Sequence, residues 1–201
     1  MPTGTSRRRL TLAVASALIV VAGAVASNAA GGAGGTDRER ASRGVIKVAL
    51  HGVDGSKVGW VSLRQTRGRV LVSGVARGLT PGFHGFHIHA IGLCEADAPA
   101  GPFTTAGGHF TGGLTNHGDH AGDMPPLLVT SNGRAFTSFV TDRFVLADLK
   151  DTDGTAVMVH AGRDNFANIP ERYSAAGVPG PDAATLATGD AGARVACGVI
   201  D

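Results

Sequence analysis

The stretch that decides the fold lies at residues 45–53 and reads VIKVALHGV. Its side chains alternate with a period of two and divide into two faces, Val45-Lys47-Ala49-His51 and Ile46-Val48-Leu50. A period of two is the repeat of a β-strand, in which successive side chains point to opposite faces. We therefore predict a β-strand with these two faces.

Seven further segments have the composition and alternation of short strands. They are residues 58–66, 69–75, 83–90, 127–131, 135–141, 156–161 and 194–200. Asp54-Gly55 and Arg67-Gly68 predict tight hairpin turns between neighbouring strands. No segment has a sustained helical repeat, and residues 144–149 predict a short turn at most. About eight short strands predict an all-β domain, either an antiparallel sandwich or a barrel.

Two long segments lie between these strands, at residues 91–126 and 162–193. Both are rich in Gly, Pro and Thr and lack the strand pattern. Loops of this length are uncommon inside a compact domain unless they carry function. We therefore expect two long functional loops.

The first 30 residues have the features of an export signal. Arg7, Arg8 and Arg9 precede an apolar run at residues 10–25, and small residues follow at 24–29. The run is shorter than the ~20 residues of a membrane-spanning helix, which favours cleavage over a retained anchor. Residues 6–10 also resemble a twin-arginine signal, and the sequence leaves the Sec and twin-arginine routes open. Residues 31–43 predict a flexible linker, so residues 44–201 remain as one domain.

The domain is nearly neutral in charge. The chain has 18 basic and 16 acidic residues, and residues 1–30 contain three of the basic ones and none of the acidic ones. A near-neutral domain lacks the basic footprint of a nucleic-acid-binding protein. We therefore expect no nucleic-acid partner, and no stable membrane insertion once the signal is cleaved.

Histidines form the first candidate metal site. His87 and His89 are separated by one residue of a predicted strand, so both imidazoles share a face and can hold one ion. His160 ends the predicted strand 156–161, where its ring can face the other two. Each feature alone also fits an ordinary structural histidine, so the prediction depends on their combination.

A second candidate site lies in the loop at residues 117–123, HGDHAGD. Its glycines allow the backbone to fold around an ion. Zinc prefers four N, S or O ligands; His117, His120 and Asp123 supply three of them, with His109 as the fourth. Asp119 competes with Asp123 for the carboxylate position, and a solvated polar loop is the alternative interpretation.

Four motifs follow one another along the domain. They are GFHGFHIH at 82–89, GGHF at 107–110, VMVH at 157–160 and GDAGARVACGVI at 189–200. Together they resemble the copper/zinc superoxide dismutases, and residues 163–170, RDNFANIP, resemble the exported bacterial, actinobacterial-like members in particular. The resemblance implies an eight-stranded antiparallel Greek-key barrel, an immunoglobulin-like sandwich, with two long functional loops.

The resemblance also implies a set of metal ligands. The implied copper ligands are His87, His89, His109 and His160. The implied zinc ligands are His109, His117, His120 and Asp123, so His109 bridges the two metals as an imidazolate. Asp164 matches a carboxylate that links a copper-binding and a zinc-binding histidine, and such partners fix the tautomer of a ligand ring.

The remaining histidines and the two cysteines have other expected roles. Cys94 and Cys197 are an even pair in an exported chain, which predicts a disulfide between the first long loop and the last strand, with two buried free thiols as the alternative. His51 is expected on a strand face. The resemblance implies that His84 bonds to the backbone rather than to metal.

The implied activity is the conversion of superoxide to oxygen and hydrogen peroxide by one-electron cycling of a histidine-bound copper. His109 is the implied proton carrier, and Arg194 matches the arginine that receives the superoxide anion. Two alternatives stay open: a copper-sequestering envelope protein on the same scaffold, and a copper-only dismutase with a vestigial zinc loop. A guanidinium beside an open copper face argues against the first, because a protein that only binds copper has no use for it.

The expected location is outside the cytoplasm, in the extracellular space, the periplasm or the cell envelope. The sequence leaves monomer and homodimer open.

Overall fold

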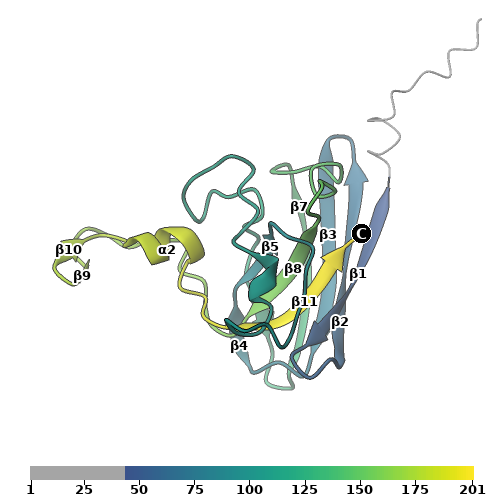
Figure 1. Cartoon of the computed structure of the whole chain (residues 1–201), viewed down its shortest axis with the longest axis horizontal. Coiled ribbons are helices and arrows are strands. Elements are labelled where there is room, and N and C mark those ends of the chain that lie inside the picture. The colour runs from purple at the N-terminus through teal and green to yellow at the C-terminus, as the bar shows by residue number, and fades with distance from the viewer. Residues whose placement is uncertain (1–43) are drawn as a thin grey trace, which may run out of the picture. The chain divides into compact units, whose positions relative to one another are not determined.

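The computed structural model describes residues 44–201, so the predicted signal (1–30) and linker (31–43) lie outside the described residues. The described chain is an almost closed antiparallel β-barrel (Figure 1). Its strands are β1 (Val45–Gly52), β2 (Lys57–Thr66), β3 (Arg69–Arg77), β4 (Gly82–His84), β5 (Phe86–His89), β6 (Leu127–Val129), β7 (Arg134–Thr141), β8 (Thr155–His160) and β11 (Arg194–Ile200). The all-β prediction is confirmed.

The alternation in β1 has the predicted consequence. Val48 and Leu50 are buried, whereas Val45, Lys47, Ala49 and His51 are exposed on the opposite face. β1 pairs with β2, and β2 with β3, through the predicted hairpins. At the second hairpin Arg67 and Gly68 both have positive φ, as a two-residue turn between twisted strands requires.

The barrel closes at Gly85. The sheet order is β4-β6-β7-β3-β2-β1-β11-β8-β5, so its two end strands, β4 and β5, are consecutive in the chain. The structure therefore divides the predicted strand 83–90 into two elements and gives the barrel sheet nine strands where the sequence predicted about eight. A Cβ at Gly85 would lie 2.6 Å from Cβ of Ala191, so the chain can switch partners here only at a glycine. The return of β6 and β7 to lie beside β3 is the predicted Greek-key arrangement.

Apolar side chains from both halves of the barrel fill its interior. The fully buried members include Leu50, Leu63, Val70, Val72, Phe86, Ile88, Leu149, Val157 and Val159. A smaller cluster of Phe103, Ala106, Ala156, Met158 and Cys197 lies under the first long loop. The barrel is thus a packed support for the loops that cover one side of it.

The predicted disulfide between Cys94 and Cys197 is confirmed, with a Cα–Cα distance of 5.7 Å. It attaches the first long loop to β11, beside the buried Phe103. This loop also contains a short 3-10 helix, η1 (Thr104–Ala106). The covalent bond and the apolar contacts both fix the loop against the barrel.

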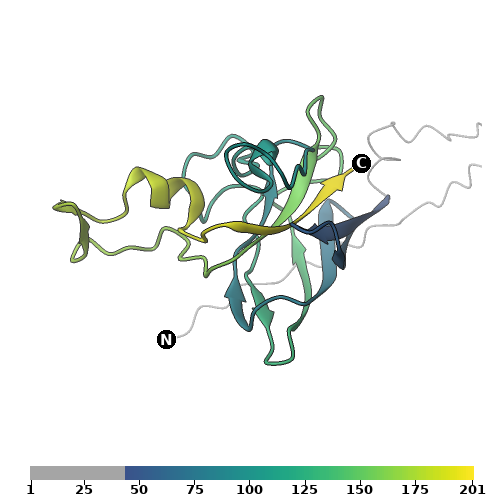
Figure 2. The same cartoon turned by 60° about the horizontal axis from the view of Figure 1, so that its bottom comes forward.

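The second long loop contains more regular structure than the sequence indicated. It includes the small hairpin of β9 (Ser174–Ala175) and β10 (Val178–Pro179) and the short helix α2 (Ala183–Thr188). Asp182 caps α2 by accepting a hydrogen bond from the Thr185 amide. Figures 1 and 2 show this hairpin and α2 extending away from the strands.

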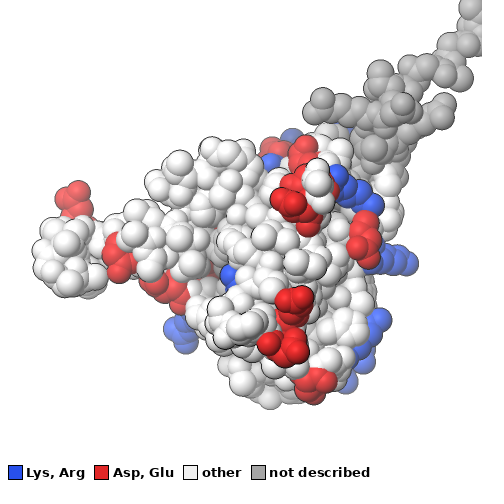
Figure 3. All heavy atoms as spheres, viewed as in Figure 1, with Lys and Arg blue, Asp and Glu red and all other residues white. Residues whose placement is uncertain are grey.

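The surface of residues 44–201 mixes charges of both signs. On the face viewed in Figure 3, acidic side chains form several small groups and most basic ones lie toward an edge. Within the described residues, no helix is both long enough and apolar enough to cross a membrane.

Candidate metal centre

Strands β5 and β8 supply the first three histidines. All four residues of β5 are buried, with His87 and His89 on one face and Ile88 in the barrel core on the other. β8 runs antiparallel to β5, placing Met158 opposite His87, and ends at His160. Two neighbouring strands therefore bring the three imidazoles together on the face of the sheet opposite the barrel core.

The first long loop brings His109 to the same place. Its backbone runs beside β5, because the Phe110 amide donates to the Ile88 carbonyl at 2.8 Å and the Ala90 amide to the Gly108 carbonyl at 2.9 Å. His109 consequently forms an isolated β-bridge with His89. The ligand atoms of His87, His89, His109 and His160 all lie within 4.8 Å of one another, and all four residues are buried.

Hydrogen bonds fix the tautomer of three of these rings. His89 donates from Nδ1 to the Gly107 carbonyl at 2.9 Å, and His160 from Nδ1 to the Gly192 carbonyl at 3.0 Å. His87 donates from Nε2 to the Asp164 carboxylate at 2.7 Å. Since each acceptor can only accept, the other ring nitrogen of each neutral histidine carries a lone pair.

These free lone pairs converge and fit a copper ion. Nε2 of His89 and Nε2 of His160 are 3.3 Å apart, although neither has a proton to share. Nδ1 of His87 and Nε2 of His109 are buried without a hydrogen-bond partner among the described residues. Converging acceptors of this kind require a cation, and an all-imidazole set suits copper.

The opposite side of His109 faces the second group. Its Nδ1 lies 2.9 Å from Oδ1 of Asp123 and 3.2 Å from Nδ1 of His117, and His117 Nδ1 lies 3.1 Å from the same oxygen. A tetrahedral zinc ion with bonds of about 2.0–2.1 Å has ligand atoms about 3.3 Å apart. The three atoms are therefore spaced as zinc ligands are, with His109 common to both groups.

The structure distinguishes between the two candidate carboxylates of the loop. Asp123 is buried beside His109 and His117, whereas Asp119 is exposed. His120 is also buried, and its Nδ1 lies 3.4 Å from Oδ2 of Asp123 without a hydrogen-bond partner among residues 44–201. The ligand atoms of His87, His109, His117 and Asp123 all lie within 4.8 Å of one another, and His120 is not part of this group.

Asp164 lies in the second long loop and links the two groups of histidines. Its Oδ2 accepts from His87, and its Oδ1 accepts from Nε2 of His117 at 2.7 Å. Gly189, at φ +62° after α2, makes this contact possible, because a Cβ there would overlap both the Asp164 carboxylate and the His117 ring. The carboxylate thereby leaves Nδ1 of both rings directed into the centre.

The electrostatics differ between the two sides. Burial lowers the pKa of His160 to about 3 and also lowers the pKa of His89. It lowers the pKa of His109 to about 4, although the neighbouring Asp123 partly offsets this effect. Burial opposes the charge on His117 as well, but its bonds to Asp123 and Asp164 outweigh this and raise its pKa to about 9. The same bonds hold the pKa of both carboxyl groups below the usual range despite their burial. The rings of His89, His109 and His160 are thus neutral, whereas the carboxylates of Asp123 and Asp164 are negatively charged.

Arg194 lies at the edge of the first group. It is opposite His160 in the β11–β8 pair, and its guanidinium donates to the carbonyls of Phe103 and Gly107, each at 2.6 Å. Burial lowers its pKa, but a guanidinium remains charged at any physiological pH. A fixed positive charge therefore stands beside the histidine cluster.

The two histidines outside the groups have the expected places. His84 is buried and bonds through Nδ1 to the His160 carbonyl at 2.6 Å and through Nε2 to the Thr80 carbonyl at 2.8 Å. His51 is exposed on β1. Sequence reasoning missed two contacts of the 117–123 loop: Phe166 stacks on His117, with ring centroids 6.1 Å apart, and Arg143 bonds to the loop backbone. No local pattern marks Arg143, and the 163–170 motif that contains Phe166 gives no indication of this contact.

Comparisons with known proteins agree with this geometry. Residues 57–200 match the family described as copper/zinc superoxide dismutase (SODC). The chain is similar to the superoxide dismutase [Cu-Zn] of Mycobacterium tuberculosis, with 43% identity over 87% of this chain and 77% of that protein. It is 38% identical to the corresponding protein of Photobacterium leiognathi, over 73% of this chain and 80% of that one.

A solved structure gives the same result for the fold. The Cu/Zn superoxide dismutase from Brucella abortus aligns with a TM-score of 0.59 and 31% identity. The alignment covers 79% of this chain and all of that chain.

Proposed function

The chain belongs to the copper/zinc superoxide dismutase family, and from this premise we propose which of its residues perform the reaction. It is an oxidoreductase whose substrate is superoxide and whose cofactors are copper and zinc. Two superoxide anions and two protons give one oxygen and one hydrogen peroxide. Copper, when bound, supplies the one-electron exchange, and zinc supplies a fixed charge without redox chemistry.

We propose His87, His89, His109 and His160 as the copper-holding residues. The observation that carries this proposal is the set of lone pairs left by the fixed tautomers, above all Nε2 of His89 and Nε2 of His160 at 3.3 Å. Nδ1 of His87 and Nε2 of His109 complete the set as buried atoms without partners among residues 44–201. The Asp164, Gly107 and Gly192 acceptors orient three of the rings and so pre-organise the site.

We propose His109, His117, His120 and Asp123 as the zinc-holding residues. The spacing of the His109, His117 and Asp123 ligand atoms supports the first three of them. The buried, unpartnered Nδ1 of His120 supports the fourth. In the metal-free protein near neutral pH, both ring nitrogens of His117 carry a proton. Zinc binding at Nδ1 of His117 therefore releases one proton.

His109 and Arg194 have the roles that act on the substrate. Nε2 of His109 faces the copper-side rings. We propose that this nitrogen carries one of the two protons to the superoxide anion that becomes hydrogen peroxide. The guanidinium of Arg194, held by two carbonyls, attracts the small anion and orients it beside the cluster.

One experiment tests this assignment. Bound copper and zinc are counted in the disulfide-bonded protein, and superoxide dismutation is measured on the same sample. One copper and one zinc per chain with fast dismutation are expected. Copper with no zinc would remove the proposed zinc set and favour the copper-only alternative; copper without activity would favour sequestration.

We also propose that the domain works outside the cytoplasm. The N-terminal sequence pattern supports an export signal at residues 1–30 and a linker at 31–43, and the Cys94–Cys197 bond fits an oxidising compartment. Mass spectrometry of the exported protein tests this proposal. A mature N-terminus between residues 24 and 31 is expected, whereas an intact Met1 in the exported fraction would contradict it.

A second copy of the chain is the proposed macromolecular partner. Five adjacent strands carry a row of apolar side chains on the outer face of the barrel: Phe83, Leu128, Phe136, Val75 and Trp60. Phe136 is 72% exposed, and four strand spacings of about 4.8 Å make the row about 19 Å long. This is a suitable apolar centre for an interface of about 800 Å² per partner.

Sedimentation tests the pairing. The wild-type protein is expected at twice the chain mass, and Phe136→Glu at the chain mass with unchanged metal content. A monomeric wild type would contradict the proposal.

A further inference from the structure

The loop between the proposed zinc ligands is held from two sides. The amides of Gly118 and His120 donate to Oδ2 of Asp123 at 2.7 Å and 3.1 Å. The carbonyls of the same two residues accept from Nη1 of Arg143 at 2.9 Å and 3.1 Å. The backbone of the 117–123 loop is therefore tied inward to a proposed ligand and outward to one arginine.

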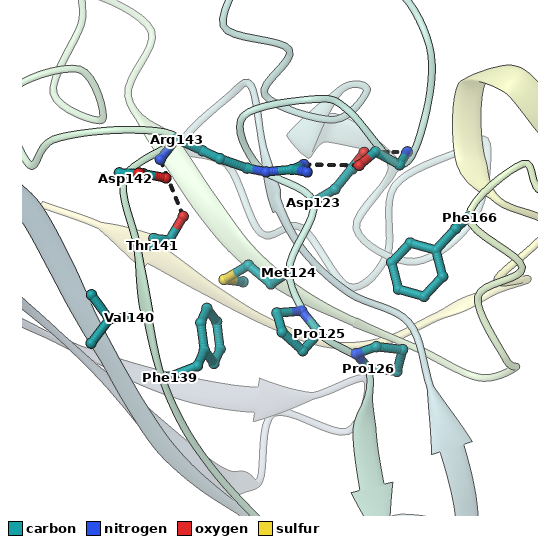
Figure 4. A pocket seen from close by; sticks show the side chains of 11 residues that line it. Asp123, Met124, Pro125, Pro126, Phe139, Val140, Thr141, Asp142, Arg143 and Phe166 are labelled. Atoms are coloured by element: carbon teal, nitrogen blue, oxygen red, sulfur yellow. Dashed lines mark hydrogen bonds between the residues drawn. The ribbon is translucent and has the colours of Figure 1, made fainter.

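Arg143 reaches this loop from a separate part of the barrel. It follows the end of β7, where its amide donates to Oγ1 of Thr141 at 3.2 Å and the next residue, Phe144, is buried in the core. Figure 4 shows the side chain extending from this point to the loop, above Met124 and Phe139. The arginine thus connects the rigid barrel to a loop that contains Gly118 at φ +91°.

The contact depends on the chemistry of a guanidinium. One terminal nitrogen carries two N–H groups in a fixed plane, and here each carbonyl accepts from that nitrogen. A lysine at this position has a compact ammonium on a flexible stem and loses more freedom when it makes the same two bonds. A side chain without donors would leave both carbonyls to water.

We infer that Arg143 is a positioning residue for zinc, an inference that rests on the proposed zinc set. By fixing the backbone at Gly118 and His120, it holds His117, His120 and Asp123 so that their ligand atoms converge. Within residues 44–201, the Arg143 side chain makes no hydrogen bond to the copper-side rings or to Arg194, so its effect is specific to zinc.

The experiment compares Arg143→Met and Arg143→Lys with the matched control Arg134→Met. Arg134 is an exposed arginine of β7 whose side chain makes no hydrogen bond within residues 44–201. The zinc dissociation constant of each metal-free, disulfide-bonded protein is measured by competition with a chelator. Copper affinity and the melting temperature of the metal-free protein are measured beside it, and Co²⁺ absorption reports the geometry of the zinc ligands.

Arg143→Met is expected to weaken zinc binding about 10- to 100-fold, the usual effect of losing a partner that orients a metal site. Arg143→Lys is expected between Arg143→Met and wild type, and Arg134→Met at the wild-type value. Copper affinity is expected to stay within about threefold, the metal-free melting temperature to match the Arg134→Met control, and the Co²⁺ spectrum to change only in the Arg143 variants.

Unchanged zinc affinity in Arg143→Met would overturn the inference while leaving the zinc set intact. Equal losses of zinc and copper affinity with a lower metal-free melting temperature would also overturn it, because the residue would then be merely structural. A wild-type protein that binds no zinc would overturn the proposed zinc set itself, and the inference with it.

Discussion

The carboxylate of Asp164 accepts a hydrogen bond from Nε2 of His117 at 2.7 Å. Its other oxygen accepts from His87, also at 2.7 Å, so one side chain orients one ring of each metal-holding group. The two groups share His109 on one side and Asp164 on the other. The two groups are consequently joined through these two residues, and a change at either of them is expected to affect both groups.

Replacing Asp164 is expected to weaken both sites. Asp164→Ala frees Nε2 of both rings and removes the preference for the tautomer that leaves Nδ1 free. Zinc and copper affinities are expected to fall about 10- to 100-fold, as measured by chelator competition. Asp119→Ala is the control, because it also removes one aspartate but at an exposed position. It is expected to leave the zinc and copper affinities unchanged. Wild-type affinities in Asp164→Ala would contradict a linking role.

Replacing His160 is expected to affect copper alone. His160→Ala removes Nε2 from the copper group but touches none of the zinc-side atoms. Copper affinity is expected to fall by more than the 10- to 100-fold typical of an outer partner, and dismutation with it. Zinc content and the Cys94–Cys197 bond are expected to remain. His51→Ala, on the exposed face of β1, is the control; full copper and full activity in His160→Ala would refute the ligand role.

Replacing Arg194 is expected to slow the reaction without removing copper. Arg194→Glu reverses the charge beside the cluster, and electrostatic steering is worth roughly ten- to a thousandfold in association rate. A loss of at least about tenfold in rate at low salt is expected, with wild-type copper content. Arg194→Lys retains the positive charge, and its rate is expected to lie between those of the wild type and Arg194→Glu. Because exposed charges are screened, the gap between wild type and Arg194→Glu should narrow as salt is added; an equal rate in both would contradict the guiding role.

The metal-free protein is expected to be most stable near pH 6.5. His109 and His160 have lowered pKa values, about 4 and 3, so below pH 6.5 the unfolded chain binds more protons and stability is lost as the pH falls. His117 has a raised pKa, about 9, so its contribution is complete below pH 6.5 and is lost as the pH rises through 9. Urea unfolding midpoints from pH 3 to pH 10 measure this profile. A midpoint that keeps rising from pH 6.5 to pH 9 would contradict the assigned protonation of His117.

Much of the barrel could be predicted from sequence, because its strands are local patterns. The alternation at 45–53 predicted the buried and exposed faces of β1 correctly, and Arg67-Gly68 predicted the turn after β2. The division at Gly85 could not be predicted, since GFHGFHIH reads as one alternating run. Only the tertiary contact with Ala191 shows that the chain changes partners there.

The candidate centre divides in the same way. His87 and His89 share a strand face, and residues 117–123 are adjacent in sequence, so their spacings in combination indicated both groups. Asp164 is 77 residues from His87, and only the family resemblance pointed to it. Arg143 carries no local signal at all, because its partners are two carbonyls of a loop more than 20 residues away.

Anomalous diffraction from crystals of the metal-loaded protein, collected at the copper and zinc absorption edges, is the direct test of whether His109 is shared by both metals. A copper peak is expected among the rings of His87, His89, His109 and His160, and a zinc peak among His109, His117, His120 and Asp123. His109 must contact both peaks. A single peak, or two peaks of which only one contacts His109, would contradict this expectation.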